Sequence, residues 1–167
     1  MAPADLPVAA LLLAALYTDL TRQKVPNTLT LGGMALGMVA NAIAGDPLVG
    51  VVGVGVAFLL MFPGWRLGRT LRAGDAKLLM AVGAFYGGGE ILRAGILTYV
   101  LAFPYALAIL LAKGRLGNVL PAIRAGIGEA LGQKVAPAEL TVVPFVPVVC
   151  AAVLVARATE VLAWLVP

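Results

Sequence analysis

Long apolar runs separated by short polar stretches divide the sequence into six segments. They cover residues 6–20, 28–45, 47–64, 76–88, 94–112 and 140–156. Hydrophobic and polar residues do not alternate within them, as they would in the strands of a membrane barrel, so the pattern predicts helices. A helix that crosses a bilayer needs about 20 residues, and we expect each run to be one crossing. The fourth run is short and could extend back through Asp75 or forward into the glycines after Tyr86.

The composition sets the class of protein. Of the 167 residues, 62% are hydrophobic and 12% are charged, and the mean hydropathy is +1.02. Soluble proteins average roughly 45–50% apolar and about 25% charged residues. A soluble domain of this length could not bury so much apolar surface. We therefore expect an all-α integral membrane protein, a polytopic bundle of six helices in which residues 1–167 form a single embedded domain.

Basic residues gather in alternate connections between the runs. Ten of the 12 follow the first, third and fifth runs, beginning with Arg22 and Lys24. The positive-inside rule places these connections in the cytoplasm, and both termini then lie outside. The net charge of +4 could instead suggest a nucleic-acid partner. No aromatic residues are interleaved with the basic ones, so we expect contact with anionic lipid and no binding of nucleic acid.

The connection from Lys113 to Glu139 is the longest. Apolar residues recur in it at helical spacing, at Leu116, Leu120, Ile123, Ile127 and Leu131. This pattern predicts an amphipathic helix lying on the cytoplasmic membrane surface between the fifth and sixth crossings. Pro121 and several glycines interrupt the pattern, and a plain connecting loop is the alternative.

Missing residue types narrow the chemistry. The sequence has no histidine and no serine, and its one cysteine is Cys150. Serine-histidine hydrolysis and zinc sites built from histidine or cysteine are therefore excluded, and no internal disulfide can form. A carboxylate is the expected catalytic group of any enzyme built from this chain, and such chemistry requires neither a metal nor a cofactor.

Two of the eight acidic residues fall at the same predicted membrane depth. Asp19 ends the first run and Asp75 opens the fourth, both at the cytoplasmic end. Acids at membrane depth usually face the bundle interior or a water-filled cavity. As alternatives, Asp75 could be a first-turn acid favoured by the helix dipole, and Asp19 could be a solvated boundary residue. The dipole disfavours a negative charge at the C-terminal end of a helix, where Asp19 lies.

Paired carboxylates have a defined reactivity. Two close carboxylates do not both ionise easily, so the pair shares a proton. The ionised member can then activate a water molecule while the protonated member donates to the scissile carbonyl, which is the aspartic-protease mechanism. The same two acids could instead act as relay groups in a small proton or solute transporter.

The sequences around both acids resemble the motifs of type IV prepilin peptidases, a family of GxGD intramembrane aspartic proteases. Asp19 to Asn27 matches the pattern D-x5-[IV]-P-N, and the Ala-Gly-Asp-Ala-Lys-Leu stretch at 73–78 resembles GxGDxKL. The resemblance covers nearly the whole chain. It is greatest to the short forms, including those serving Flp/Tad-type pili, and extends more distantly to archaeal preflagellin peptidases and presenilin-type proteases.

The resemblance implies that Asp19 and Asp75 are the catalytic aspartates. It implies removal of a prepilin leader, just after a glycine, at the cytoplasmic face of a prokaryotic plasma membrane. Four further positions match the motifs and are expected to support the site: Gly74, Lys77, Pro26 and Asn27. A glycine at 74 allows close backbone approach. Pro26 and Asn27 suit the turn and cap that begin the second helix, and Lys77 could simply extend to the interface.

The chain also departs from the family pattern. Arg72 stands where the motif has its first glycine. The long forms have four additional cysteines and methylate the new N-terminus, whereas this sequence has only Cys150, so the resemblance implies the peptidase alone. A non-catalytic scaffold whose site is altered by Arg72 is a further alternative, and a homo-oligomer is left open.

Overall fold

The computed structural model describes residues 3–68, 73–114, 117 and 144–165, and in this part of the chain helices are joined by short turns and there is no strand. Its five helices are α1 (Asp5–Arg22), α2 (Asn27–Ile43), α3 (Pro47–Gly68), α4 (Ala73–Ala112) and α6 (Val146–Leu165). The all-α prediction is confirmed, and α1 to α3 match the first three predicted runs to within a few residues.

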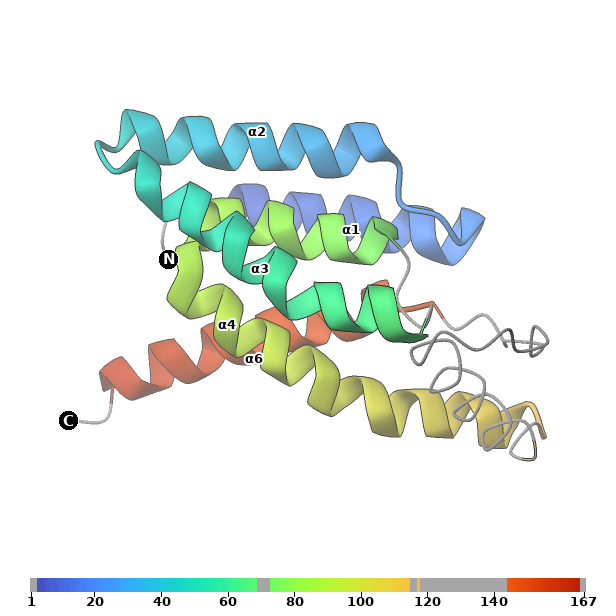
Figure 1. The fold of residues 1–167 in the computed structure, drawn as a ribbon. Helices are drawn as coiled ribbons and strands as arrows, with labels where there is room; N and C mark the ends of the chain where they lie inside the picture. The colour runs from blue at the N-terminus through green and yellow to red at the C-terminus, as the bar shows by residue number, and fades with distance from the viewer. Residues whose placement is uncertain (1–2, 69–72, 115–116, 118–143, 166–167) are drawn as a thin grey trace.

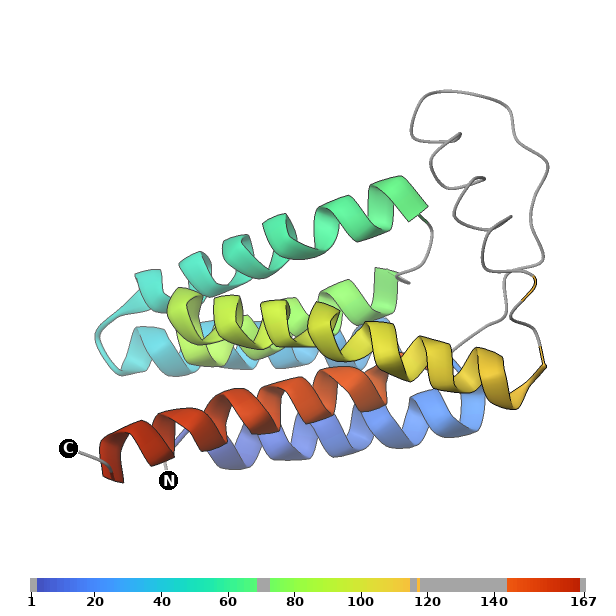
Figure 2. The same cartoon turned by 90° about the horizontal axis from the view of Figure 1, so that it is seen from below.

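The predicted break between the fourth and fifth runs is wrong in its position. Residues 89–93, expected to be a connection, are helical, and the interruption is a single residue, Gly87, with φ 81° and ψ −176°. Glycine lacks the Cβ that disfavours positive φ, so one residue suffices for the break. Figures 1 and 2 show that α4 folds back on itself, and its two parts run in opposite directions.

The last helix also differs from its predicted range of 140–156. It begins at Val146, after two non-helical residues, and continues to Leu165. Pro147 lies in the first turn, where its missing N–H removes no helical hydrogen bond. Residues 140–143 and most of the predicted amphipathic segment 113–139 lie outside the described residues, so that helix stays a prediction.

Glycines allow the helices of the bundle to approach closely. A Cβ built on Gly53 of α3 would overlap the carbonyl of Gly83 on α4, and one built on Gly83 would lie 2.5 Å from the Gly53 oxygen. A Cβ on Gly37 of α2 would lie 2.8 Å from the backbone of Ala84. Small residues permit such backbone contact in membrane bundles. Here this packing is between helices of one chain.

Large apolar side chains remain exposed around the bundle, among them Leu6 at 81%, Ile43 at 82% and Phe103 at 75%. Such extensive exposure indicates a surface that contacts another apolar phase. Within the described residues, one helix, α4, is long and apolar enough to be a candidate membrane span by length and composition, and shorter apolar stretches occupy Pro47–Pro63 and Val146–Thr159. Six crossings therefore remain a prediction.

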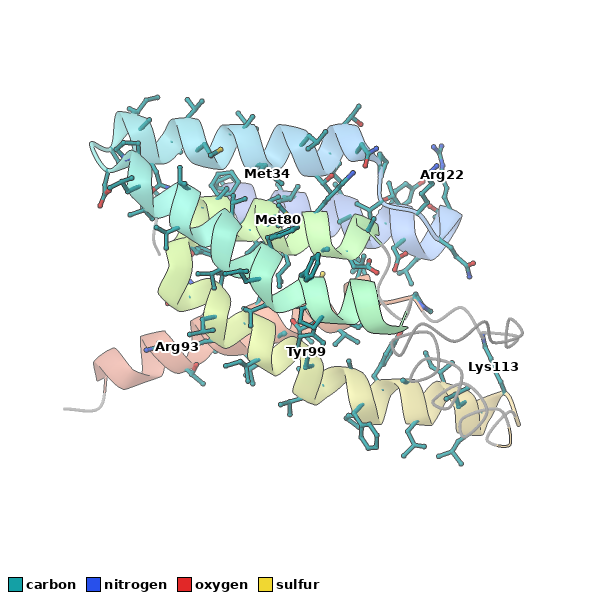
Figure 3. All side chains as sticks on the ribbon, viewed as in Figure 1. Arg22, Met34, Met80, Arg93, Tyr99 and Lys113 are labelled. Atoms are coloured by element: carbon teal, nitrogen blue, oxygen red, sulfur yellow. The ribbon has the colours of Figure 1, made fainter. Side chains whose placement is uncertain are left out.

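The start of α1 and the end of α6 lie at one end of the bundle (Figure 1). At the opposite end, α1 stops and α4 begins. Figure 3 shows Arg22 and Lys113 at this second end, and Arg93 toward the end of the termini. The C-terminal end of α1 and the N-terminal end of α4 thus lie at the same end of the bundle as the basic side chains of Arg22 and Lys113.

Candidate active site

Asp19 lies in the last turn of α1, and only 3% of its surface is exposed. A carboxylate at the C-terminal end of its own helix faces the negative end of the helix dipole. Another helix compensates, because the backbone N–H of Val146, the first residue of α6, donates to Asp19 Oδ2 at 3.3 Å. The free amides and the dipole at a helix N-terminus favour a negative charge.

Asp75 is the third residue of α4 and is also 3% exposed. Its position in the first turn places it at the positive end of its own helix. The end of α1 and the start of α4 lie at the same end of the bundle (Figure 2). Asp19, in the last turn of α1, and Asp75, in the first turn of α4, therefore both belong to that end. The site therefore contains two buried carboxylates, each associated with the N-terminus of a helix.

The other motif residues join the two sequence motifs in space. Lys77 Nζ donates to Asn27 Oδ1 at 3.0 Å. A Cβ built on Gly74 would lie 3.6 Å from Cβ of the buried Val25, an ordinary van der Waals distance. The α1–α2 connection thus packs on the first turn of α4. A side chain would therefore fit at Gly74, and the expected close backbone approach to the site stays a prediction.

Pro26 directly precedes α2 and has an extended backbone, with φ −64° and ψ 140°. Its carbonyl accepts hydrogen bonds from the N–H groups of Leu29 and Thr30 at 3.1 and 3.3 Å. Pro26 therefore sets the start of the helix that carries Asn27, in agreement with the predicted turn. The predicted cap is wrong, because Pro26 itself occupies the N-cap position, no side chain caps the helix, and Asn27 is its first residue.

A second polar group, the Arg157 cluster, lies away from the two aspartates and consists of Asp5, Tyr86, Glu90 and Arg157. The Arg157 guanidinium lies 2.9 Å from Asp5 Oδ1 and 3.6 Å from Glu90 Oε1. The Tyr86 hydroxyl donates to Asp5 Oδ1 at 3.0 Å, and the guanidinium lies 4.9 Å from the centre of the tyrosine ring. These contacts join α1, α4 and α6.

Two contacts therefore hold α6 against α1, the Asp19–Val146 hydrogen bond and the Asp5–Arg157 ion pair. The sequence patterns predicted neither contact. A signal for the first was present in Pro144 and Pro147, since proline is favoured just before and within the first turn of a helix.

The model of the type IV leader peptidase family matches residues 6–114. The chain belongs to the type IV leader peptidase family. The match includes both aspartates and covers α1 to α4 nearly completely. This leader peptidase is accordingly a membrane-associated peptidase, as its sequence motifs predicted. No curated protein and no solved structure gave a match.

Proposed function

We propose that this leader peptidase is an intramembrane aspartic endopeptidase in which Asp19 and Asp75 form the catalytic pair. The observation that carries the proposal is the arrangement of these two acids. Both are 3% exposed, and both lie at the end of the bundle where α1 stops and α4 starts. Asp75 lies in the first turn of α4, and Asp19 accepts a hydrogen bond from the first residue of α6. Burying a carboxylate costs free energy unless nearby groups stabilise its charge, and here the amide groups at a helix N-terminus can do so.

The proposed reaction needs only the two carboxyl groups and water. One ionised carboxylate removes a proton from water, whose oxygen attacks the scissile carbonyl carbon, while the other carboxyl group protonates the carbonyl oxygen. The resulting diol collapses as the C–N bond breaks, and the departing amine takes a proton from the pair. Lys77 and Asn27 support the site by holding the α1–α2 connection against α4.

The substrate we propose is a type IV prepilin-like protein, from which the enzyme removes the leader at the cytoplasmic face of the plasma membrane. The basic residues support this orientation, since Arg22 and Lys113 lie at the end of the bundle that holds the aspartates (Figure 3). Positive side chains mark the cytoplasmic ends of membrane helices. The chain would then be a multi-pass protein with both termini outside.

The decisive experiment compares three Asp→Asn variants. The full chain, in detergent or liposomes, is incubated with a prepilin-like substrate that retains its leader, and the products are weighed by mass spectrometry. Asp19→Asn and Asp75→Asn should each lower the cleavage rate by at least about a hundredfold, because general acid–base groups contribute roughly 10²–10⁴. Asp46→Asn, in the exposed connection between α2 and α3, is the control and should cleave normally.

Three outcomes would contradict this function. Normal cleavage by either variant would show that its aspartate is not catalytic. Absence of any product from the folded wild type would favour a non-catalytic scaffold, and proton or solute flux in liposomes that depends on Asp19 and Asp75 would favour a transporter.

A further inference from the structure

The α6 helix lies beside α1 and runs antiparallel to it (Figure 2). Three residues of α1 that are seven positions apart, about two helical turns, lie on one face of the helix and contact α6. The contacting pairs are Asp5 with Arg157, Leu12 with Cys150, and Asp19 with Val146. This register places the first turn of α6 beside Asp19.

The first turn of α6 offers a single amide to Asp19. Most helices leave their first four N–H groups without a helical partner. Here Val146 is the first residue, and Pro147 has no N–H. The N–H groups of the next two residues donate to the carbonyl of Phe145 at 3.0 and 3.3 Å. In this described turn, the Val146 N–H is therefore the one that remains, and it donates to Asp19.

This hydrogen bond holds Asp19 through one carboxylate oxygen. Val146 donates to Oδ2 at 3.3 Å, and among the described residues it is the sole hydrogen-bond donor to this carboxylate. An N–H donor is bound more strongly by a charged acceptor than by a neutral one. The contact limits rotation of the carboxylate about the Cβ–Cγ bond, and it leaves Oδ1 able to accept a proton from water.

Packing along α6 fixes the position of this amide. Val146, Val149, Val153 and Ala156 recur at helical spacing, and all four are buried in the core of the bundle. The ion pair of Arg157 with α1 follows directly after them. The start of α6 is therefore held in place before any substrate binds, and a donor fixed in advance need not be reoriented during a reaction.

We infer that Val146 is a positioning residue of the peptidase, whose backbone N–H holds Asp19 by Oδ2 so that Oδ1 removes the proton from water. The inference rests on the proposed function. In this step the water O–H bond breaks, Oδ1 gains the proton, and the water oxygen uses the released electron pair to bond to the scissile carbonyl carbon. The carbonyl oxygen takes its proton from Asp75. A segment beyond residues 6–114, which match the family model, thus completes the site.

Val146→Pro removes this N–H and tests the role. Proline is favoured at the first position of a helix, where no helical hydrogen bond is lost. The full chain in detergent is assayed with a prepilin-like substrate that retains its leader, and kcat and KM are measured per folded protein. Val146→Pro should lower kcat by about tenfold to a hundredfold, the effect of one hydrogen bond to a charged group. KM should stay unchanged, because the amide contacts Asp19 and not the substrate.

Val146→Ala is the matched control, because it keeps the N–H and removes more of the buried side chain than proline does. It should be less stable than wild type and retain its kcat. If the proline variant fails to fold, the α-hydroxy acid analogue of valine at position 146 decides, since it replaces the N–H by an ester oxygen and keeps the side chain.

A normal kcat in the folded proline or hydroxy-acid variant would overturn the inference. An equal loss of kcat in Val146→Ala would do so too, because it would show that the side chain matters and not the amide. Either result leaves the proposed function intact as long as Asp19→Asn abolishes cleavage. Normal cleavage by Asp19→Asn would instead contradict the proposed function itself.

Discussion

Asp19 on α1 accepts a hydrogen bond from the backbone N–H of Val146, at the start of α6, over 3.3 Å. The two residues are far apart in sequence, and Val146 lies beyond residues 6–114, which match the family model. The last helix therefore supplies part of the electrostatic environment of a proposed catalytic group. The positive N-terminal end of α6 lies beside the C-terminal end of α1, where the dipole of α1 disfavours a carboxylate.

Two substitutions separate the structural role of Asp19 from its proposed catalytic role. Asp19→Asn retains an oxygen that can accept the Val146 N–H, whereas Asp19→Ala leaves that buried amide without its acceptor. Both should lack peptidase activity, but the alanine variant should be less stable than the asparagine variant by about 0.5–2 kcal/mol, the cost of losing a helix cap. Thermal unfolding in detergent measures the difference. Identical unfolding of the two variants would contradict the capping role.

Asn41 on α2 stabilises the break at Gly87. Its side-chain amide donates to the carbonyls of Ala84 at 2.7 Å and Phe85 at 3.3 Å, just before the break interrupts the helical hydrogen bonds. Asn41→Leu should destabilise the fold by about 1–3 kcal/mol, because both carbonyls lose a donor. Asn41→Asp, which keeps the size but not the donor, should be at least as destabilising. Chemical unfolding in detergent tests this, and unchanged stability of Asn41→Leu would exclude the role.

The contact between Gly53 and Gly83 should not tolerate a methyl group. Gly53→Ala would force α3 away from α4, and overpacking of this kind costs typically about 1–3 kcal/mol. Gly55→Ala is the matched control, because nothing lies within 4 Å of a Cβ built there. Alanine is the better helix former by roughly 1 kcal/mol, so the control should be neutral or stabilising. Equal unfolding temperatures for the two variants would argue against the close contact.

The sequence predicted the helical segments well where one apolar run ends at a strong signal. Pro26 and Pro47 mark the starts of α2 and α3, and both were placed within a residue. The connection after Gly87 was misplaced because three consecutive glycines resemble a loop, whereas only the first has a positive φ. Composition alone cannot distinguish a one-residue break from a longer connection.

For the site, the motifs identified Asp19 and Asp75, and the structure buries both at one end of the bundle. Their surroundings could not be predicted, because they depend on contacts between distant segments. Val146 offers only a backbone N–H, which no residue pattern reveals. Spacing along the helix favours a pair between Arg157 and Glu160, three residues later. The described partners of Arg157 are Asp5 and Glu90, which come from other helices, and the Glu160 side chain is outside the described residues.

The ion pair between Asp5 and Arg157 provides the last test, because its partners can be exchanged. Both side chains are 22% exposed, so removing one partner leaves a largely buried charge. Arg157→Asp alone places two acids against each other and should destabilise the fold by about 3 kcal/mol or more.

Asp5→Arg combined with Arg157→Asp should recover part of that loss, and Arg22→Met, at an exposed arginine of α1, is the control. Glu90 limits the recovery, since it lies 3.6 Å from the position that becomes acidic. Thermal unfolding of wild type, Asp5→Arg, Arg157→Asp and the double variant gives the coupling between the two sites. A double variant no more stable than Arg157→Asp would mean that Asp5 does not hold α6 against α1, and that the Asp19–Val146 contact forms without this support.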